Sequence, residues 1–256
     1  MRLLKNVTKN YSDIRENPSY QFSKNYALSI YPLDAVYTFI PKNGCSTLRF
    51  STAVANGFLS DLEDVNWIHL NNPTFNASQR EISLAKYTFI VLRCPFRRLA
   101  SCFLNKFVTD EMQLNTEDGK YIDANFSLFV DLVASQKREM MDAHWRHQSD
   151  FLHYERYDDY FSLERFNVAI KKLKEKGFEV IDTRSALKHD NSRMEKKNGD
   201  YSSTPISELK KMRSEGYVPT DRALYTEKTY SIIQNVYKED FELYKKHIGE
   251  KNILKL

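Results

Sequence analysis

Two short apolar runs, each leading into a loop and then a helical pattern, restrict the possible folds of this chain more than any other feature. They span residues 35–40 and 87–92 and are rich in β-branched and aromatic side chains. Such runs are typical of buried strands. Strands that alternate with helices along a chain favour a mostly parallel sheet covered by helices. We therefore expect an α/β fold with a P-loop-like central sheet.

The loop after the first run predicts an anion site. Its sequence is Pro41-Lys42-Asn43-Gly44-Cys45-Ser46-Thr47, and the following helix is expected to begin near Thr47. Such a loop directs several backbone N–H groups at one point, where the helix N-terminus adds partial positive charge. Lys42 precedes the glycine, whereas in the nucleotide-hydrolase loop G-x-x-x-x-G-K-[ST] the lysine follows it. The loop therefore suits a phosphate group but does not match a Walker A loop.

The second run ends in an arginine. Arg93 is followed by Pro95, which suits the first position of a helix, and we expect that helix over residues 95–107. Ser101 lies eight residues after Arg93. ATP- and GTP-hydrolysing P-loop proteins usually hold Mg²⁺ with an acid at the end of this strand. An arginine at that place predicts contact with an anion and no metal site.

Together these motifs resemble the 3′-phosphoadenosine 5′-phosphosulfate (PAPS)-dependent sulfotransferases, most closely the carbohydrate type called sulfotransferase family 2, which includes chondroitin sulfotransferases. That family carries P-K-x-G-C-S and R-x-P-F-x-R-L-x-S segments, which correspond here to residues 41–46 and 93–101. Residues 142–148 are similar to its H-W-x-x-Q segment. The family commonly has Asp at the position of Cys94 and a cysteine pair after the H-W segment, and this chain has neither.

The resemblance implies a role for each matched residue. The loop would bind the 5′-phosphosulfate through Lys42, Asn43, Gly44, Cys45, Ser46 and Thr47. Lys42 would also stabilise the charge that develops on the departing phosphate oxygen. Arg93 and Ser101 would bind the 3′-phosphate. PAPS would act as the co-substrate.

The residue that takes the proton of the acceptor hydroxyl is open to more than one interpretation. Histidine suits this step near neutral pH, which makes His144 the first candidate. Asp142 or Glu155 could orient its ring. His144 could equally be a packed histidine beside Trp145. The competing bases are two acids, Glu63 and Asp64.

The predicted function is sulfuryl transfer from PAPS to a hydroxyl of a carbohydrate or glycolipid, by an in-line displacement that needs no metal. One alternative is a P-loop nucleotide kinase or NTPase, which would require Mg²⁺ and ATP. The arginine at position 93 argues against that alternative. A second alternative is a non-catalytic nucleotide-binding protein of the same fold.

Composition limits the expected partners and location. The 256 residues suffice for one domain with a substantial core, and the formal net charge of +4 is too small to indicate nucleic acid. Three cysteines without a C-x-x-C pair indicate neither zinc nor a disulfide framework. No apolar run reaches the ~18 residues of a membrane span, and the N-terminus lacks the apolar core of a signal peptide. We therefore expect a cytoplasmic, microbial protein.

We expect one domain over residues 1–256, with an N-terminal extension over about residues 1–30 and a charged loop over about 188–203. Residues 61–83 are mixed in pattern, and residues 112–123 are polar and turn-rich. Short strands are expected over residues 157–163 and 178–181. Periodicity and capping residues predict further helices over residues 47–59, 125–133, 166–176, 205–215 and 226–246.

Overall fold

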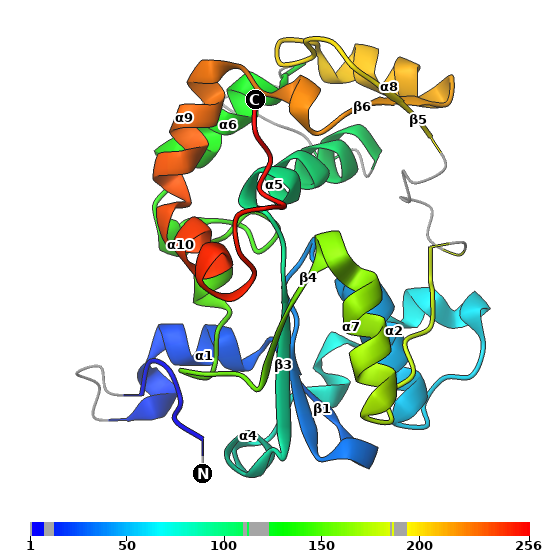
Figure 1. Cartoon of the computed structure of the whole chain (residues 1–256), viewed down its shortest axis with the longest axis vertical. Coiled ribbons are helices and arrows are strands. Elements are labelled where there is room, and N and C mark those ends of the chain that lie inside the picture. Colours follow the sequence, from blue (N-terminus) through cyan, green and yellow to red (C-terminus); the bar gives the residue numbers. More distant parts are fainter. Residues whose placement is uncertain (1, 8–12, 110–111, 113–122, 185, 187–193) are drawn as a thin grey trace. The chain divides into compact units, whose positions relative to one another are not determined.

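Figure 1 shows the computed structural model of the chain, which describes residues 2–7, 13–109, 112, 123–184, 186 and 194–256. Its contacts divide the chain into two compact units. Unit 1 comprises Met1–Arg93 and His147–Leu187, and unit 2 comprises Cys94–Arg146 and Lys188–Leu256. The expectation that the whole chain acts as one domain stays a prediction.

Unit 1 contains the central sheet. Its strands follow the order β1 (Ala27–Ile30), β2 (Ala35–Thr38), β3 (Tyr87–Leu92) and β4 (Asp159–Ser162). The β2–β3 and β3–β4 pairs are parallel, and only the short edge strand β1 is antiparallel to its neighbour. All six residues of β3 are buried, as a central parallel strand requires. The predicted α/β fold with a mostly parallel sheet is confirmed.

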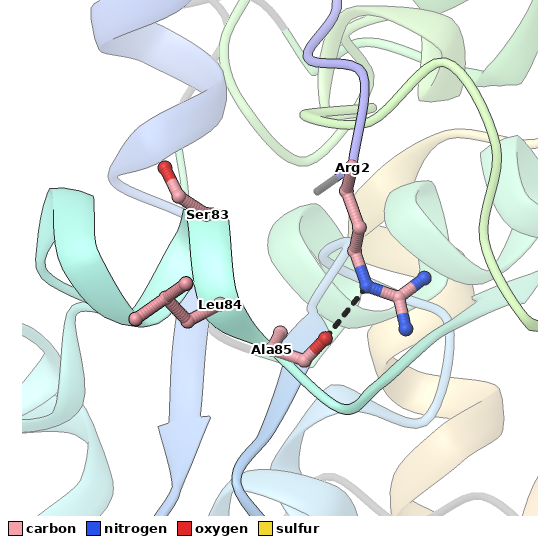
Figure 2. Close-up of a pocket in the computed structure, with 4 residues that line it drawn as sticks. All are labelled: Arg2, Ser83, Leu84 and Ala85. Atoms are coloured by element: carbon pink, nitrogen blue, oxygen red, sulfur yellow. Dashed lines mark hydrogen bonds between the residues drawn. The ribbon is translucent and has the colours of Figure 1, made fainter.

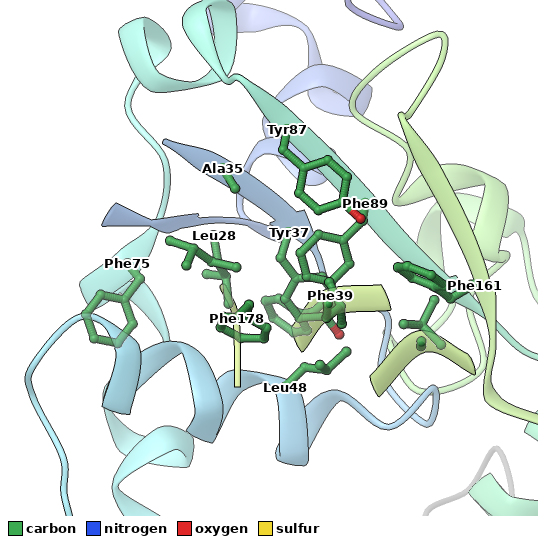
Figure 3. Packing of buried hydrophobic residues seen from close by; sticks show 14 of the residues in the cluster. Leu28, Ala35, Tyr37, Phe39, Leu48, Phe75, Tyr87, Phe89, Phe161 and Phe178 are labelled. Atoms are coloured by element: carbon green, nitrogen blue, oxygen red, sulfur yellow. The ribbon is translucent and has the colours of Figure 1, made fainter. Parts of the chain in front are cut away.

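One face of this sheet carries the apolar core of unit 1 (Figure 3). Alternate strand residues such as Tyr37, Phe89 and Phe161 point to this face, where Tyr37 and Phe89 stack with ring centroids 4.9 Å apart. The helices α2 (Cys45–Ala55) and α7 (Phe166–Glu175) cover them through Leu48 and Leu173. This packing fixes the start of α2 against the sheet.

Polar contacts also join segments of unit 1 that are far apart in the sequence. The Thr38 hydroxyl lies 2.9 Å from the Tyr157 hydroxyl, and Tyr154 donates to the carbonyl oxygen of Ile82 in α4 (Gln79–Leu84). His153 Nδ1 lies 2.8 Å from the Ser23 hydroxyl in α1 (Pro18–Lys24). Unit 1 also contains the short helix α3 (Trp67–Leu70).

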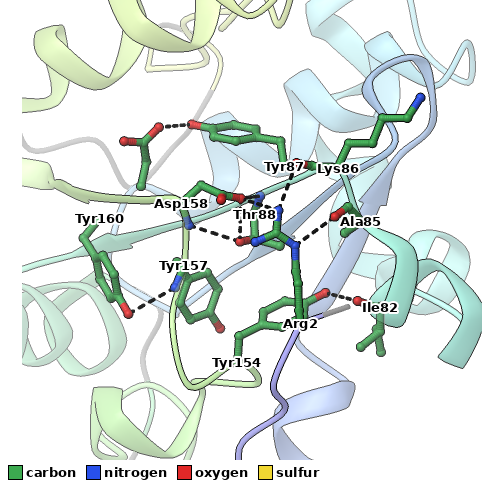
Figure 4. Close-up of polar contacts among 11 residues, drawn as sticks. Arg2, Ile82, Ala85, Lys86, Tyr87, Thr88, Tyr154, Tyr157, Asp158 and Tyr160 are labelled. Carbon is green, nitrogen blue, oxygen red and sulfur yellow. Dashed lines mark hydrogen bonds and ion pairs between the residues drawn. The ribbon is translucent and has the colours of Figure 1, made fainter.

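The beginning of β3 is tied to the N-terminal segment (Figure 4). The Arg2 guanidinium donates to the carbonyl oxygens of Ala85 and Lys86 and pairs with Asp158 at 2.6 Å. Asp158 in turn accepts a bond of 2.7 Å from the backbone N–H of Thr88. Arg2, α1 and β1 therefore contribute to the folded structure of unit 1, within the segment expected to be an extension.

Unit 2 is mainly helical. Helix α5 (Pro95–Phe103) runs into a π-helical turn, Leu104–Thr109. Aromatic rings form much of its interior, including Phe96 stacked on Tyr230 with centroids 4.0 Å apart. Two short parallel strands, β5 (Glu195–Lys197) and β6 (Tyr217–Pro219), pair with each other. The remaining helices are α6 (Phe126–Ser135), α8 (Ile206–Ser214), α9 (Glu227–Val236) and α10 (Lys238–His247).

Several predicted elements need correction. The predicted strand over residues 178–181 is wrong, because this segment has no strand pairing. The predicted helix over residues 226–246 is two helices, α9 and α10, separated at Tyr237. Helix α2 begins two residues before Thr47 and ends at Ala55, and the charged segment after residue 188 contains β5. Residues 113–122 and 188–193 of the predicted turn-rich and loop segments lie outside the described residues.

In the part of the chain that the structure describes, no helix combines the length and apolar character needed to span a membrane.

Candidate functional site

The loop between β2 and α2 has an unusual backbone. Lys42 and Gly44 both adopt left-handed conformations, with φ of 72° and 76°. For Lys42 this conformation is uncommon, because a β-carbon crowds the backbone there. At Gly44 a β-carbon would also lie 2.9 Å from Leu163 Cδ1. Any other residue at position 44 would therefore be strained and would require the Leu163 side chain to move, which is why glycine suits this sharp turn from the strand into the helix.

The N-terminus of α2 directly follows this turn. Gly44 is its N-cap and has no side chain with which to accept bonds from the first-turn N–H groups. The N-terminal end of an 11-residue helix with such groups attracts anions through its partial positive charge. Lys42, half-buried at the head of the loop, adds a full positive charge. The loop is therefore suited chemically to a phosphate or phosphosulfate.

Arg93 lies directly after β3 and contacts the loop. Its guanidinium Nη1 donates a bond of 2.8 Å to the carbonyl oxygen of Lys42. The side chain is half-buried. The Arg93 guanidinium is thus held against the backbone of the loop that carries Lys42.

The side chain of Asn43 anchors the loop to β3 and to Gln148. This side chain is fully buried, and Nδ2 donates to the carbonyl oxygen of Val91 at 2.8 Å and to Gln148 Oε1 at 2.7 Å. The same Gln148 oxygen accepts from the backbone N–H of Arg93 at 3.0 Å, and Gln148 Nε2 donates to the Arg93 carbonyl at 2.8 Å. The side chain of Asn43 therefore holds the loop in place, and its predicted part in binding PAPS stays a prediction.

The other loop residues have distinct surroundings. The Cys45 thiol interacts with Arg49, a buried residue whose guanidinium lies 5.1 Å from the centroid of the Phe39 ring. Burial lowers the pKa of the Arg49 guanidinium. The Thr47 hydroxyl lies 2.8 Å from the buried Thr183 hydroxyl. Ser46 is half-buried at the second position of α2.

The remaining motif residues belong to unit 2. Pro95 occupies the start of α5 as predicted, and Cys94 is its buried N-cap residue, whose sulfur accepts from the backbone N–H of Leu254 at 3.4 Å. Ser101 is half-buried in the same helix. Its predicted contact with a 3′-phosphate stays a prediction.

His144 lies in a turn with Asp142. The Asp142 carboxylate oxygen Oδ1 lies 2.7 Å from His144 Nδ1 and accepts from the His144 backbone N–H at 2.8 Å. Partial burial of the Asp142 carboxyl raises its pKa, but the bonds to His144 outweigh this effect and lower the pKa below its ordinary value. A carboxylate only accepts, so in the neutral imidazole Nδ1 is the nitrogen that carries the proton and Nε2 the one with the lone pair. The imidazole is about one-third exposed, at 33%. Such a ring can accept a proton at Nε2.

Two buried residues support the His144 turn. The Arg98 guanidinium, from the second motif, donates to the carbonyl oxygens of Ala143 and Arg146 at 3.1 and 2.7 Å. The Tyr237 hydroxyl donates to the carbonyl oxygen of Trp145. Neither residue was predicted to act at the site, although Arg98 lies inside the R-x-P-F-x-R-L-x-S segment.

The competing candidates have other surroundings. Glu63 and Asp64 are exposed in the 3-10 helix Leu62–Asn66 of unit 1. Glu155 is exposed in unit 1 as well. Asp142, one of the two orienting partners that the sequence suggested, contacts the His144 ring.

A pocket of about 370 Å³ lies elsewhere in unit 1 (Figure 2). Arg2, Ser83, Leu84 and Ala85 line it, and the Arg2 guanidinium is bound to the Ala85 carbonyl. None of the predicted site residues lines this pocket, and its one charged group is already paired with Asp158. Among the described residues, no cluster of three or more His, Cys, Asp or Glu side chains could hold a metal ion.

Comparison with known proteins was made against family models, curated proteins and solved structures. The model of one family, described as "Sulfotransferase family", matches residues 33–247. This match spans both units and covers most of the chain. Neither the curated proteins nor the solved structures gave a significant match.

Proposed function

The chain belongs to the sulfotransferase family, and on that premise we propose that it transfers a sulfuryl group from PAPS to a hydroxyl of a carbohydrate or glycolipid acceptor. The observation that supports the choice of donor is the bond from the Arg93 guanidinium to the Lys42 carbonyl, in the loop that leads into α2. This bond sets one cationic side chain against a loop that carries a second one and ends at a helix N-terminus, which suits a ligand with more than one anionic group.

In this reaction a bond forms between the acceptor oxygen and sulfur while the bond from sulfur to the 5′-phosphate oxygen breaks. Negative charge grows on the departing phosphate oxygen. Lys42 and the first N–H groups of α2 would stabilise that charge where it develops. Arg93, with Ser101, would bind the 3′-phosphate. The role of Ser101 rests on its position in the motif.

The acceptor hydroxyl must lose a proton as it attacks sulfur. We assign this proton to His144 Nε2, because Asp142 holds the other ring nitrogen as a donor. After the transfer, the Asp142 carboxylate would stabilise the imidazolium through the same contact. The assignment to a carbohydrate or glycolipid hydroxyl rests on the family resemblance.

A kinase or NTPase of similar fold is less well supported. Its loop would carry the lysine after the second glycine, and its β3 would end in an acid for Mg²⁺. Here the lysine is residue 42, ahead of Gly44, and β3 is followed by Arg93. Both features favour a donor that is bound without a metal.

The test compares ligands and then turnover. Adenosine 3′,5′-bisphosphate should raise the unfolding temperature more than ATP with Mg²⁺, because binding to the folded state stabilises it. Labelled PAPS should then transfer its sulfuryl group to a panel of glycans and glycolipids. Stabilisation by ATP–Mg²⁺ alone would support the kinase alternative. Bisphosphate binding without transfer to any acceptor would support a non-catalytic protein.

A further inference from the structure

The carboxamide of Gln148 contacts two separate parts of the proposed donor site. It accepts from Asn43 in the loop and both accepts from and donates to the backbone of Arg93, over 2.7, 3.0 and 2.8 Å. Only 1% of the residue is exposed. A buried amide with all three of these bonds has one orientation, because turning it over would set donors against donors.

These contacts form a closed ring of interactions, here called the circuit, through Gln148, Asn43, Lys42 and Arg93. Gln148 holds Asn43, Asn43 is joined by the chain to Lys42, and the Lys42 carbonyl accepts from the Arg93 guanidinium. Arg93 in turn is held at its backbone by Gln148. Asn43 stands between two residues with positive φ, so its anchoring also fixes the strained part of the loop. The circuit lies within unit 1.

We infer that Gln148 is a positioning residue, which sets the spacing between the loop that takes the 5′-phosphosulfate and the arginine that takes the 3′-phosphate. This inference rests on the proposed function. A nucleotide with phosphates at both ends of its ribose binds best when its two anion sites are already at the right distance. Gln148 is buried and would act through Asn43 and Arg93, so its effect should depend on how many of the two sites a ligand uses.

The first variant is Gln148→Met, which keeps the length of the side chain and removes all three bonds. We expect it to weaken adenosine 3′,5′-bisphosphate by roughly 10–10²-fold, the range for a misplaced binding group. Adenosine 5′-monophosphate, which engages one site, should lose several-fold less. Gln136→Met is the matched control, since Gln136 belongs to unit 2 and accepts one bond there from Trp145 Nε1.

Two further variants keep the test decisive if Gln148→Met is too unstable to purify. Gln148→Glu retains an acceptor for Asn43 and for the Arg93 N–H but cannot donate to the Arg93 carbonyl when ionised. It should lose part of the preference for bisphosphate over monophosphate. Asn43→Ala should have an effect similar to Gln148→Met, and the double variant should be no weaker than the worse single variant.

Calorimetry of both ligands, with unfolding temperatures of each variant, separates the outcomes. If the wild-type protein fails to bind the bisphosphate, the proposed function falls. If the wild-type protein binds it and the Gln148 variants lose affinity for both ligands equally, or lose none, the positioning role is overturned and the proposed function stands.

Discussion

The guanidinium of Arg93 donates a hydrogen bond of 2.8 Å to the carbonyl oxygen of Lys42. Lys42 has a left-handed backbone with φ of 72°, which costs a residue with a β-carbon about 1 kcal/mol. The contact therefore helps to hold a conformation that the isolated loop would not favour. It follows that substitutions at these two positions should not act independently.

Lys42→Ala should lower kcat by roughly 10²–10³-fold, because it removes one group that stabilises the departing phosphate oxygen. Its backbone cost is similar to that of lysine, so the fold should be preserved. Sulfuryl transfer measured with saturating PAPS tests this prediction. Lys174→Ala, an exposed lysine on α7, is the control and should keep full activity. Turnover close to wild type in Lys42→Ala would remove the loop from the reaction.

Arg93→Ala should weaken adenosine 3′,5′-bisphosphate by roughly 10–10²-fold, since it removes charged hydrogen bonds. Adenosine 5′-monophosphate should be weakened much less, because it lacks the 3′-phosphate. Calorimetric titration of both ligands makes the comparison. Equal losses would mean that Arg93 acts only by holding the Lys42 carbonyl.

His144→Ala should reduce turnover by roughly 10²–10⁴-fold, the range for loss of a general base, while bisphosphate affinity stays nearly constant. Asp142→Asn should reduce turnover less, because the imidazole remains but loses the carboxylate that orients it. Glu63→Gln and Asp64→Asn serve as comparisons and should remain active. If His144→Ala keeps its rate while one of these acids proves essential, the base is that acid.

His153 should make unit 1 sensitive to mild acid. The residue is completely buried, and burial, together with the charge of Lys24, lowers the pKa of its imidazole from the ordinary 6.5 to about 4. Between these two pKa values, the imidazole of His153 binds a proton in the unfolded chain but not in the folded chain. Its contribution to stability is thus fully present above pH 6.5 and is lost as the pH falls towards 4, by about 3 kcal/mol.

Urea unfolding from about pH 7 to about pH 4 measures this effect. The midpoint of wild type should fall more steeply with acid than that of His153→Asn, which can keep a polar contact with the Ser23 hydroxyl. His69→Asn is the control, because His69 is exposed and lies in the same unit. Parallel curves for wild type and His153→Asn would contradict the prediction.

The strands and helices that frame the loop could be predicted because their signals are local. Strand β3 is a run of six apolar or β-branched residues, and Pro95 marks the start of α5. The strand predicted over residues 178–181 is wrong because Phe178 is buried without being in a strand. Its backbone N–H is bonded to the end of α7, and that of Ile181 to the Ser51 hydroxyl. A pattern of apolar residues indicates that the side chains are buried, but it does not by itself show that the backbone is a strand.

Other features depend on contacts between distant residues. The break between α9 and α10 falls at Tyr237, which is buried and donates to the carbonyl oxygen of Trp145. The Asn43–Gln148 bond joins residues 105 positions apart. Motif resemblance brought Lys42, Arg93 and His144 to attention because their residue types match a known chemistry. Gln148 and Arg98 lie in the matched segments too, but most of their bonds are to backbone groups of distant residues, and nothing in a single sequence specifies which backbone group a side chain will meet.

The close approach of Leu163 to Gly44 limits which amino acids position 44 can accept. Every amino acid other than glycine brings a β-carbon, and at position 44 that atom would stand 2.9 Å from Leu163 Cδ1 on a backbone with φ of 76°. Gly57 has a similar φ of 81° but nothing within 4 Å of the same place, so asparagine, which tolerates this conformation, could replace it. A substitution at Gly57 would therefore meet only the cost of its backbone conformation, whereas a substitution at Gly44 would also require the Leu163 side chain to move.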